Sequence, residues 1–516
     1  MKEITTDRIV IVGAGLGALY AALELAPRPV LVIAPEILGQ GASSAWAQGG
    51  VAAAMAKADS AASHSADTVR AGAGIVDEAV ADRVTQDARD HILELTDLGT
   101  PFDRSPEGGY VMSREAAHSF ARVVRVKGDQ AGAAIMAALI KQIRRAPSVQ
   151  ILEGTMALAL ETQGEAVTGI VIQASGPERS APVMLRGAAY LLAGGGSGGL
   201  YALTTNPDRI RGQVIGMAAR AGAMIADAEF VQFHPTALDV GEDPAPLATE
   251  ALRGEGATLI NKHGTRFMLG VHSDAELAPR DVVAREIFAQ TQAGNRPMLD
   301  TRAALGDTIK SLYPAVTAAC ARNGIDPSVE AIPVAAAAHY HMGGIATNAE
   351  GRSSLGNLWV CGEASSTGLH GANRLASNGL LEALVYARIC AVNIAANTPM
   401  YQAPEVALSF GAENNTPPAT AIETLRQTMT EHVGVLRNGD GLRAALRQIA
   451  ALEDANQNNV EFLTMCATAT LIAASALLRE ESRGAHERTD FPQMSAGPAQ
   501  RSMMTLAHAQ ALKDAL

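Results

Sequence analysis

The chain has 516 residues, with 41 basic and 53 acidic side chains and a formal net charge of −12. Its length allows two to four domains, and a hydrophobic fraction of 48% suffices for buried cores and excludes a disordered chain. An acidic chain without a block of lysines and arginines is not expected to bind nucleic acid. Since we find neither a secretory segment nor an unbroken apolar run near the roughly 18 residues that span a bilayer, we expect a cytoplasmic protein with no integral membrane segment.

The four cysteines lie far apart in the sequence and form no C-x-x-C pair: Cys320, Cys361, Cys390 and Cys466. Disulfides, zinc sites and iron–sulfur clusters require closer or patterned spacing, so we expect four buried thiols. The 49 glycines exceed the average share of about 7%, and they are clustered. Clustered glycines indicate backbone packed closely against a ligand.

The first elements in chain order are a β-branched strand over 8–12, a glycine turn, a helix over 19–25 and a second strand over 29–33. In a G-x-G-x-x-A turn of this kind, backbone amides at a helix N-terminus bind a pyrophosphate. We therefore predict a nucleotide cofactor on a Rossmann-like fold. The residues of the turn are Gly13, Ala14, Gly15, Leu16 and Gly17.

The acidic residue that usually ends the second strand and binds the ribose is replaced here by Ala34 and Pro35. Glu36 follows, and it is either the displaced ribose partner or a solvated loop charge. The sequence leaves both alternatives open.

Two further strands end in glycine, one over 189–193 before Gly194-Gly195-Gly196 and one over 356–361 before Gly362 and Glu363. Together with the first strand they indicate one nucleotide-binding domain interrupted by an insertion. After Pro404 helical periodicity predominates, over 421–432, 441–452 and 459–479, which predicts an antiparallel bundle. We expect a nucleotide-binding domain at 1–227 and 343–410, an insertion at 228–342, and a helical domain at 411–516.

Six short clusters hold an unusual share of the histidine, arginine, threonine and glutamate residues. Each alone is more often structural, but beside a cofactor motif two arginines and two histidines in one pocket suit a small dicarboxylate, because arginine matches carboxylate geometry. His234 and His339 have no partner at i+3 or i+4, so no metal site is expected. The clusters span 114–118, 233–236, 249–253, 279–281, 339–344 and 371–374.

From Arg8 to about Pro492 the chain resembles the flavoprotein family of succinate dehydrogenase, fumarate reductase and L-aspartate oxidase. The resemblance implies an α/β Rossmann-like FAD-binding domain, an inserted α+β capping domain, a C-terminal helical bundle, and oxidation of a four-carbon dicarboxylate. The motifs that carry it are Ala47-Gln48-Gly49-Gly50, Phe233-His234-Pro235-Thr236, Leu252 to Ala257, Ala278 to Arg285, His339 to Gly344, Thr367 to Arg374 and Glu481 to His486.

Two positions indicate the aspartate-oxidising branch of this family. Ser43 stands where the subunits of membrane complexes carry a histidine bonded to FAD, so the resemblance implies non-covalent FAD. Glu115 matches the acid near the ammonium group of aspartate, although it could instead cap a following helix. The implied reaction oxidises L-aspartate to iminoaspartate with O₂, giving H₂O₂, or with fumarate, giving succinate. It is the first step of NAD synthesis from aspartate, which makes quinolinate synthase a candidate partner.

The resemblance also assigns roles to individual residues. Arg280 would be the proton donor and acceptor, with Glu250 and Arg253 as a relay behind it. Because a free guanidinium stays protonated at neutral pH, Arg280 could instead act through its charge alone. Substrate would be bound by Glu115, His234, Thr249, His339 and Arg374. FAD would be bound by Gly13, Ala14, Gly15, Leu16, Gly17, Ser43, Ser44, Ala45, Trp46, Ala47, Gln48, Gly49, Gly50, Gln213, Glu363, Gly379 and Leu380.

The chain departs from the family pattern at a few cofactor positions. Gln213 stands where the family has an acid that touches FAD, and Gly379 replaces the usual serine. With Ala34 and Pro35, these departures predict FAD binding weaker than is typical. The alternatives are a soluble fumarate reductase, a succinate dehydrogenase flavoprotein subunit, or a scaffold that only binds FAD.

Overall fold

The computed structural model describes residues 1–177 and 179–516, and a five-stranded parallel sheet lies at its centre. The strand order is β18-β11-β2-β3-β7, so β2 is the middle strand and its carboxyl end opens into the glycine turn. Ligands of doubly wound sheets bind at this edge. The strands are β2 (Ile9–Val12), β3 (Val30–Ala34), β7 (Val149–Glu153), β11 (Ala189–Leu192) and β18 (Leu358–Val360).

Both faces of this sheet are buried, which explains why its strands read as unbroken apolar runs. Ile9, Ile11 and Val32 belong to a core shared with the helices on one face, whereas Val10 and Leu31 belong to the core on the other face. Because side chains alternate along a strand, each strand contributes to both cores. The helices of the first face are α1 (Leu16–Glu24), α4 (Glu78–Asp97), α5 (Ala131–Ile143) and α11 (Asn378–Asn397), with α3 (Ala61–Ala71) packed on α4.

Three smaller sheets complete this part of the chain, with strand orders β1-β10-β9-β8, β19-β17-β12-β20 and β4-β6-β5. Helix α6 (Gln213–Arg220) packs on the first of them, and the short α2 (Ser43–Trp46) packs on α5. The strands are β1 (Lys2–Thr5), β8 (Thr155–Gln163), β9 (Ala166–Ala174), β10 (Val183–Arg186), β12 (Ile225–Ala226), β17 (Gly344–Ala346), β19 (Ser365–Ser366), β20 (Met503–Met504), β4 (Val51–Ala52), β5 (Met112–Ser113) and β6 (Val123–Val124).

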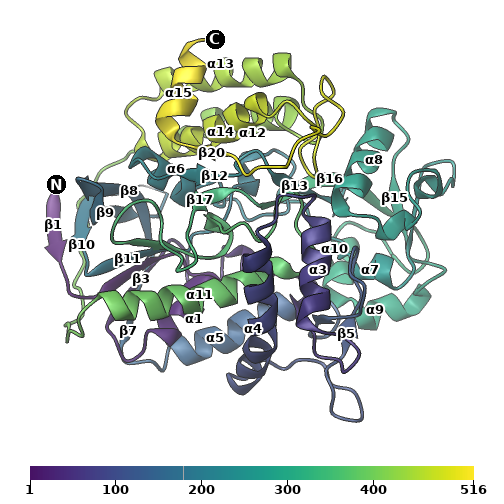
Figure 1. Cartoon of the computed structure of the whole chain (residues 1–516), viewed down its shortest axis with the longest axis horizontal. Helices are drawn as coiled ribbons and strands as arrows, with labels where there is room; N and C mark the ends of the chain where they lie inside the picture. The colour runs from purple at the N-terminus through teal and green to yellow at the C-terminus, as the bar shows by residue number, and fades with distance from the viewer. Residues whose placement is uncertain (178) are drawn as a thin grey trace.

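A four-stranded antiparallel sheet, β13-β16-β15-β14, and its helices form the teal part of the molecule in Figure 1. Pairing of β13 with β16 sets His234 opposite Ala337 and Gln232 opposite Tyr340, so residues about 100 positions apart become neighbours. The elements are β13 (Val231–Leu238), β14 (Thr258–Ile260), β15 (Met298–Asp300), β16 (Ile332–His341), α7 (Ala251–Gly254), α8 (Arg280–Gln292), α9 (Ile309–Leu312) and α10 (Pro314–Arg322).

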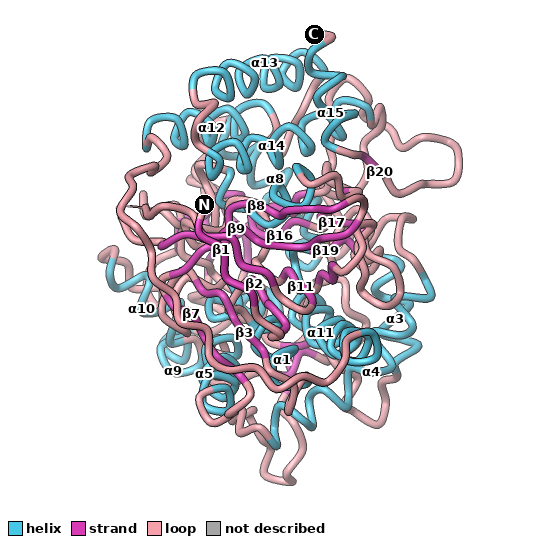
Figure 2. The backbone as a smooth tube through the Cα atoms, turned by 90° about the vertical axis from the view of Figure 1, so that its left-hand side faces the viewer, coloured by secondary structure: helices cyan, strands magenta, loops and turns pink. Residues whose placement is uncertain are grey.

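Four C-terminal helices gather at one end of the molecule (Figure 1), and Figure 2 shows the strands as a layer between them and helices α1, α4, α5 and α11. Asn438 and Asn459 cap two of them, because their side chains accept hydrogen bonds from the first-turn amides. The tail is not helical throughout, since β20 pairs with β12. The helices are α12 (Ala419–His432), α13 (Gly439–Ala455), α14 (Val460–Leu478) and α15 (Leu506–Asp514).

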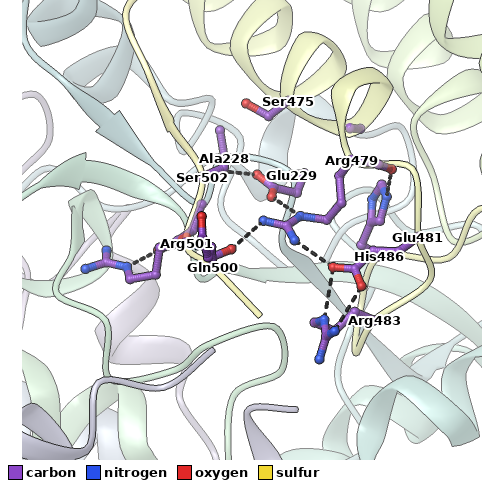
Figure 3. A network of polar contacts seen from close by, with 12 residues as sticks. Ala228, Glu229, Ser475, Arg479, Glu481, Arg483, His486, Gln500, Arg501 and Ser502 are labelled. Atoms are coloured by element: carbon purple, nitrogen blue, oxygen red, sulfur yellow. Dashed lines mark hydrogen bonds and ion pairs between the residues drawn. The ribbon is translucent and has the colours of Figure 1, made fainter. Parts of the chain in front are cut away.

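A polar network fixes this tail to the strand that carries site residues (Figure 3). Arg479, at the end of α14, donates hydrogen bonds to Glu229 and Glu481, and Ser502 donates to the second oxygen of Glu229 at 2.7 Å. Glu229 is fully buried and lies two residues before β13. Since a buried charge is costly unless it is paired, this contact holds the C-terminal segment against the start of β13.

Two helices, α11 and α14, are long and apolar enough to cross a membrane by length and composition, with mean hydropathies of 1.5 and 1.7. Neither helix is an unbroken apolar run, since polar residues such as Thr464, Thr468 and Ser475 of α14 and Glu382 and Arg388 of α11 interrupt them. Of their apolar windows, 61% and 89% are buried inside the protein. Burial on all sides explains an apolar helix of this length, because a helix in a core has no solvent face.

Candidate functional site

A cavity of about 970 Å³ lies at the carboxyl edge of the parallel sheet. The segments that follow β2, β3, β11 and β18 all contribute to its wall. Gly49 and Gly50 lie outside this lining, so their contact with a cofactor stays a prediction. The other residues expected at the cofactor line the cavity: Gly13 to Gly17, Ser43 to Gln48, Gln213, Glu363, Gly379 and Leu380.

The glycine turn after β2 has the geometry of a phosphate cradle. Gly13 has φ of +119°, and a Cβ there would lie 2.2 Å from the carbonyl oxygen of Ala193, so only glycine fits. Gly15 is the N-cap of α1 and supplies no side-chain cap. The Leu16 amide donates a hydrogen bond to Ser44 Oγ at 3.1 Å, and the following amides of the first turn are available to an anion. Among the described residues, the buried Ser43 Oγ and Gln48 Oε1 have no hydrogen-bond partner. The turn and these unpartnered atoms fit a phosphate-bearing cofactor.

Three polar residues of the cavity wall that the sequence singled out, Glu36, Gln213 and Glu363, differ in their partners. Glu36 is half-buried and forms an ion pair with Arg209, so it is not a freely solvated charge. The side chain of Gln213 accepts a hydrogen bond from the Arg211 amide at 3.0 Å. Glu363 accepts one from the His341 amide at 2.9 Å, and burial raises its pKa to about 7.

His234 and His339 lie together, with ring centroids 5.0 Å apart. Burial first, and nearby arginine charges second, lower the pKa of both rings well below the ordinary value, so both are neutral. Nδ1 of His234 accepts a hydrogen bond from the Thr236 amide at 3.2 Å. A neutral ring that accepts at Nδ1 carries its proton on Nε2, so His234 presents an N–H donor.

Arg374 lies at the boundary between this pair and the large cavity. Its guanidinium stacks over the ring of Tyr340 at 4.2 Å, and its buried Nε has no partner among the described residues. Burial lowers its pKa to about 10, so it remains charged at neutral pH. An arginine with an unused donor favours an anionic ligand. A Cβ on Gly379 would lie 3.1 Å from this guanidinium.

Glu250 joins three segments of the chain. One of its oxygens accepts a hydrogen bond from the Ala116 amide at 2.6 Å, and the other pairs with Arg280 and lies 3.4 Å from Arg253. Burial raises the pKa of Glu250, but the two arginines outweigh it and hold the pKa at about 2. Arg280 also donates to Gln232 Oε1 at 3.2 Å. The structure thus places the three residues of the expected relay in contact.

Glu115 lies next to this group and is 2% exposed. Ser377 donates a hydrogen bond to its Oε2 at 2.8 Å, while Oε1 has no partner among the described residues. Burial, and then the charge of Glu250, raises its pKa to about 7. Residues 116 and 117 form a turn, 119 and 120 form bends, and the next element is strand β6, so the alternative that Glu115 caps a following helix was wrong.

The structure brings the predicted substrate and relay residues close together, with Thr249 next to Glu250 in the chain. All of them are buried except His339, which is partly exposed and lines the large cavity with Arg374. Two further residues were missed by sequence reasoning. Gln232 binds Arg280 and also donates to the Arg374 carbonyl at 2.9 Å, and Ser377 binds Glu115. The only signal for either was its position beside a predicted cluster.

Comparisons with known proteins agree with this geometry. The family model for the FAD binding domain matches residues 8–380, and the model described as fumarate reductase flavoprotein C-term matches residues 455–514. An L-aspartate oxidase from Caulobacter vibrioides is 48% identical over 503 residues, which cover 95% of this chain and 94% of that protein. One from Bacillus subtilis is 36% identical, with coverage of 94% and 91%.

Among solved structures, the FrdA chain of E. coli quinol fumarate reductase is 27% identical and has a TM-score of 0.86. The match covers 98% of this chain and 94% of that chain. The same layers of helices and sheets are therefore present over the full length of both proteins.

We expect Gly13→Ala to purify with at least about threefold less FAD, because the new Cβ collides with the Ala193 carbonyl and displaces the amides of the turn. The ratio of flavin absorbance to protein absorbance measures this loss. Gly99→Ala is the matched control, since Gly99 has φ of +104° and open space around it. Full FAD content in Gly13→Ala would contradict the phosphate cradle.

Proposed function

Because the chain belongs to the L-aspartate oxidase family of flavoproteins, we propose that it oxidises L-aspartate to iminoaspartate with FAD as cofactor. O₂ as electron acceptor gives H₂O₂, and fumarate gives succinate. The observation that carries this proposal is Glu115, a buried carboxylate with one free oxygen beside a pocket of arginines and histidines. It supplies the one recognition group that aspartate needs and succinate does not.

The two carboxylates of the substrate are bound by Arg374, His234, His339 and Thr249. Arg374 has an unused donor, and His234 has a free N–H. Arg374, His234 and Thr249 are buried, so their hydrogen bonds to a dianion form in a medium of low dielectric, where they are stronger than in water. The arrangement fixes the substrate at both ends and leaves its Cα at one defined place.

FAD, when bound, would supply the two-electron redox chemistry. In fumarate reduction Arg280 donates a proton to a substrate carbon, whereas in aspartate oxidation the proton lost comes from the ammonium group and Arg280 acts through its charge. Glu250 and Gln232 hold its guanidinium in one orientation, and Glu250 connects it to Arg253, whose pKa is lowered by burial. Its positive charge also stabilises negative charge that develops on the substrate.

Three further features belong to this proposal. Residues 228–342 form a capping domain over the flavin, between a FAD-binding domain at 1–227 and 343–410 and a helical domain at 411–516. The enzyme works in the cytoplasm. Its product is an imine, which hydrolyses in water unless a second enzyme takes it up. In this proposal quinolinate synthase is that enzyme.

A soluble fumarate reductase is the second candidate, since the fold matches the FrdA chain closely. L-Aspartate oxidation requires a group that binds the ammonium of the substrate, whereas fumarate reduction does not. The position of Glu115 therefore favours L-aspartate oxidation.

We expect FAD to be released completely by acid precipitation, because Ser43 has no imidazole for a covalent bond to the flavin. The yellow colour should stay in the supernatant, as absorbance at the flavin band will show. Colour retained in the pellet would favour a membrane-complex subunit instead.

Arg280→Leu should lower kcat for fumarate reduction by about 10²-fold or more, since it removes both a proton donor and a charge at the reacting carbon. FAD content should not change. Arg302→Leu is a control, because Arg302 is half-exposed and pairs only with Asp300 among the described residues. If Arg280→Leu raises KM and leaves kcat intact, Arg280 is a binding residue only.

Glu115→Gln should lower kcat/KM for aspartate by about 10- to 150-fold, the worth of a charge-assisted hydrogen bond of roughly 1.5–3 kcal/mol. Fumarate reduction should stay within a few-fold. Because a carboxyl with a pKa of about 7 is protonated below that pH, kcat/KM for aspartate should fall as pH drops below about 7 in the wild type. This fall of kcat/KM at low pH should be absent from Glu115→Gln.

If aspartate oxidation and fumarate reduction fall together, or if the melting temperature drops with them, Glu115 has a structural role and the choice of aspartate loses its support.

A further inference from the structure

We infer that His118, held by Arg122, is a positioning residue for Glu115 and thereby for recognition of the substrate's ammonium group. The inference rests on the proposed function, and no contact between His118 and substrate is required. It concerns two buried segments, the turn 114–119 and the loop 376–378, which meet where Ser377 binds Glu115.

The loop 376–378 has a backbone conformation that needs support. Ser377 has φ of +62° at the N-cap of α11, a region that residues other than glycine adopt only at an energetic cost. The Ala376 carbonyl accepts a hydrogen bond from His118 at 2.9 Å, and the Asn378 side chain bonds His64 at 2.8 Å. Both histidines therefore hold the loop on either side of Ser377.

His118 can have only one protonation state in this arrangement. Arg122 is a donor only and lies 3.4 Å from Nδ1, whereas the Ala376 carbonyl is an acceptor only. The ring must therefore accept at Nδ1 and carry its proton on Nε2. Burial lowers the pKa of His118 to about 4, which keeps this neutral form at physiological pH.

Arg122 fixes the position of His118. It is fully buried and donates two hydrogen bonds of 2.9 Å to Asp59 and one of 2.7 Å to Asp67. Asp67 also accepts hydrogen bonds from the amide and hydroxyl of Ser119, both at 2.7 Å. These bonds anchor the end of the turn, and the bond from the Ala116 amide to Glu250 anchors its start.

One turn thus contacts the loop at two points, through Glu115 to the hydroxyl of Ser377 and through His118 to the preceding carbonyl. The backbone bond from the His118 amide to the Glu115 carbonyl, at 3.3 Å, closes the turn between them. If His118 loses its bond, Ser377 is free to leave its strained conformation and its hydrogen bond to Glu115. The carboxylate would then lose both its orientation and a bond that lowers its pKa.

The experiment compares His118→Asn, whose amide is too short to reach the Ala376 carbonyl, with His118→Gln, whose amide can reach it. His118→Asn should lower kcat/KM for aspartate by about tenfold, mainly through KM, with fumarate reduction and FAD content within about threefold. The fall of kcat/KM for aspartate at low pH should begin at a higher pH than in the wild type. His118→Gln should recover kcat/KM to within about threefold of the wild type.

His91→Phe is the matched control, since His91 is a buried neutral histidine of α4 whose ring bonds the Tyr20 hydroxyl of α1. It should leave both activities unchanged. If His118→Asn is too unstable to purify, His118→Phe replaces it with the same expected results. An equal loss of both activities, or a fall at low pH that begins at the same pH as in the wild type, would overturn the positioning role alone. A wild-type enzyme that does not oxidise aspartate would overturn the proposed function itself.

Discussion

The carboxylate of Glu250 is bonded at once to the Ala116 amide and to two arginines, and all of these groups are shut off from solvent. Arg280 begins α8, Arg253 belongs to α7, and Ala116 lies in a turn from a distant part of the sequence. Removal of the Glu250 carboxylate would leave Arg280 and Arg253 as buried charges without an acidic partner, which is far more costly than loss of an exposed ion pair. The position of each segment therefore depends on the other two.

This interaction also separates the behaviour of two neighbouring carboxylates. Arg280 and Arg253 pair with Glu250 and hold its pKa at about 2. Burial and the negative charge of Glu250 raise the pKa of Glu115 to about 7. Two acids with separated pKa values in one pocket can have separate roles. Glu250 is a permanent anion that holds Arg280, and Glu115 is the acid whose ionisation near neutral pH prepares the site for an ammonium group.

The sequence predicted the fold well where an element is specified by residues that lie close together in the chain. The strand, glycine turn and helix at 9–24 lie where the apolar run and the Gly13 motif indicate, and the predicted helix at 459–479 differs from α14 by one residue at each end. The C-terminal segment also supplies β20, a two-residue strand that is too short to leave a periodic pattern.

Few contacts of the site could be predicted from such local patterns. No spacing rule relates Glu115, Glu250 and Arg280, and only the family resemblance assigned them to one site. In the structure, the bonds of Glu250 to Arg280 and to the Ala116 amide, next to Glu115, bring them together. Ser377 carries a backbone conformation that its residue type does not predict. Gln232, His118 and Arg122 act through buried hydrogen bonds to distant segments, and a side chain in such a role has no signature of its own in a single sequence.

Oxygen uptake by the FAD-reconstituted protein, recorded with L-aspartate, L-glutamate and succinate in turn, tests the central claim most directly. The account predicts uptake with aspartate, accompanied by H₂O₂, and rates at least about tenfold lower with the other two, because succinate lacks the ammonium group that Glu115 binds and glutamate is one methylene too long for a fixed clamp. Uptake with succinate equal to that with aspartate, or no uptake with aspartate, would contradict it.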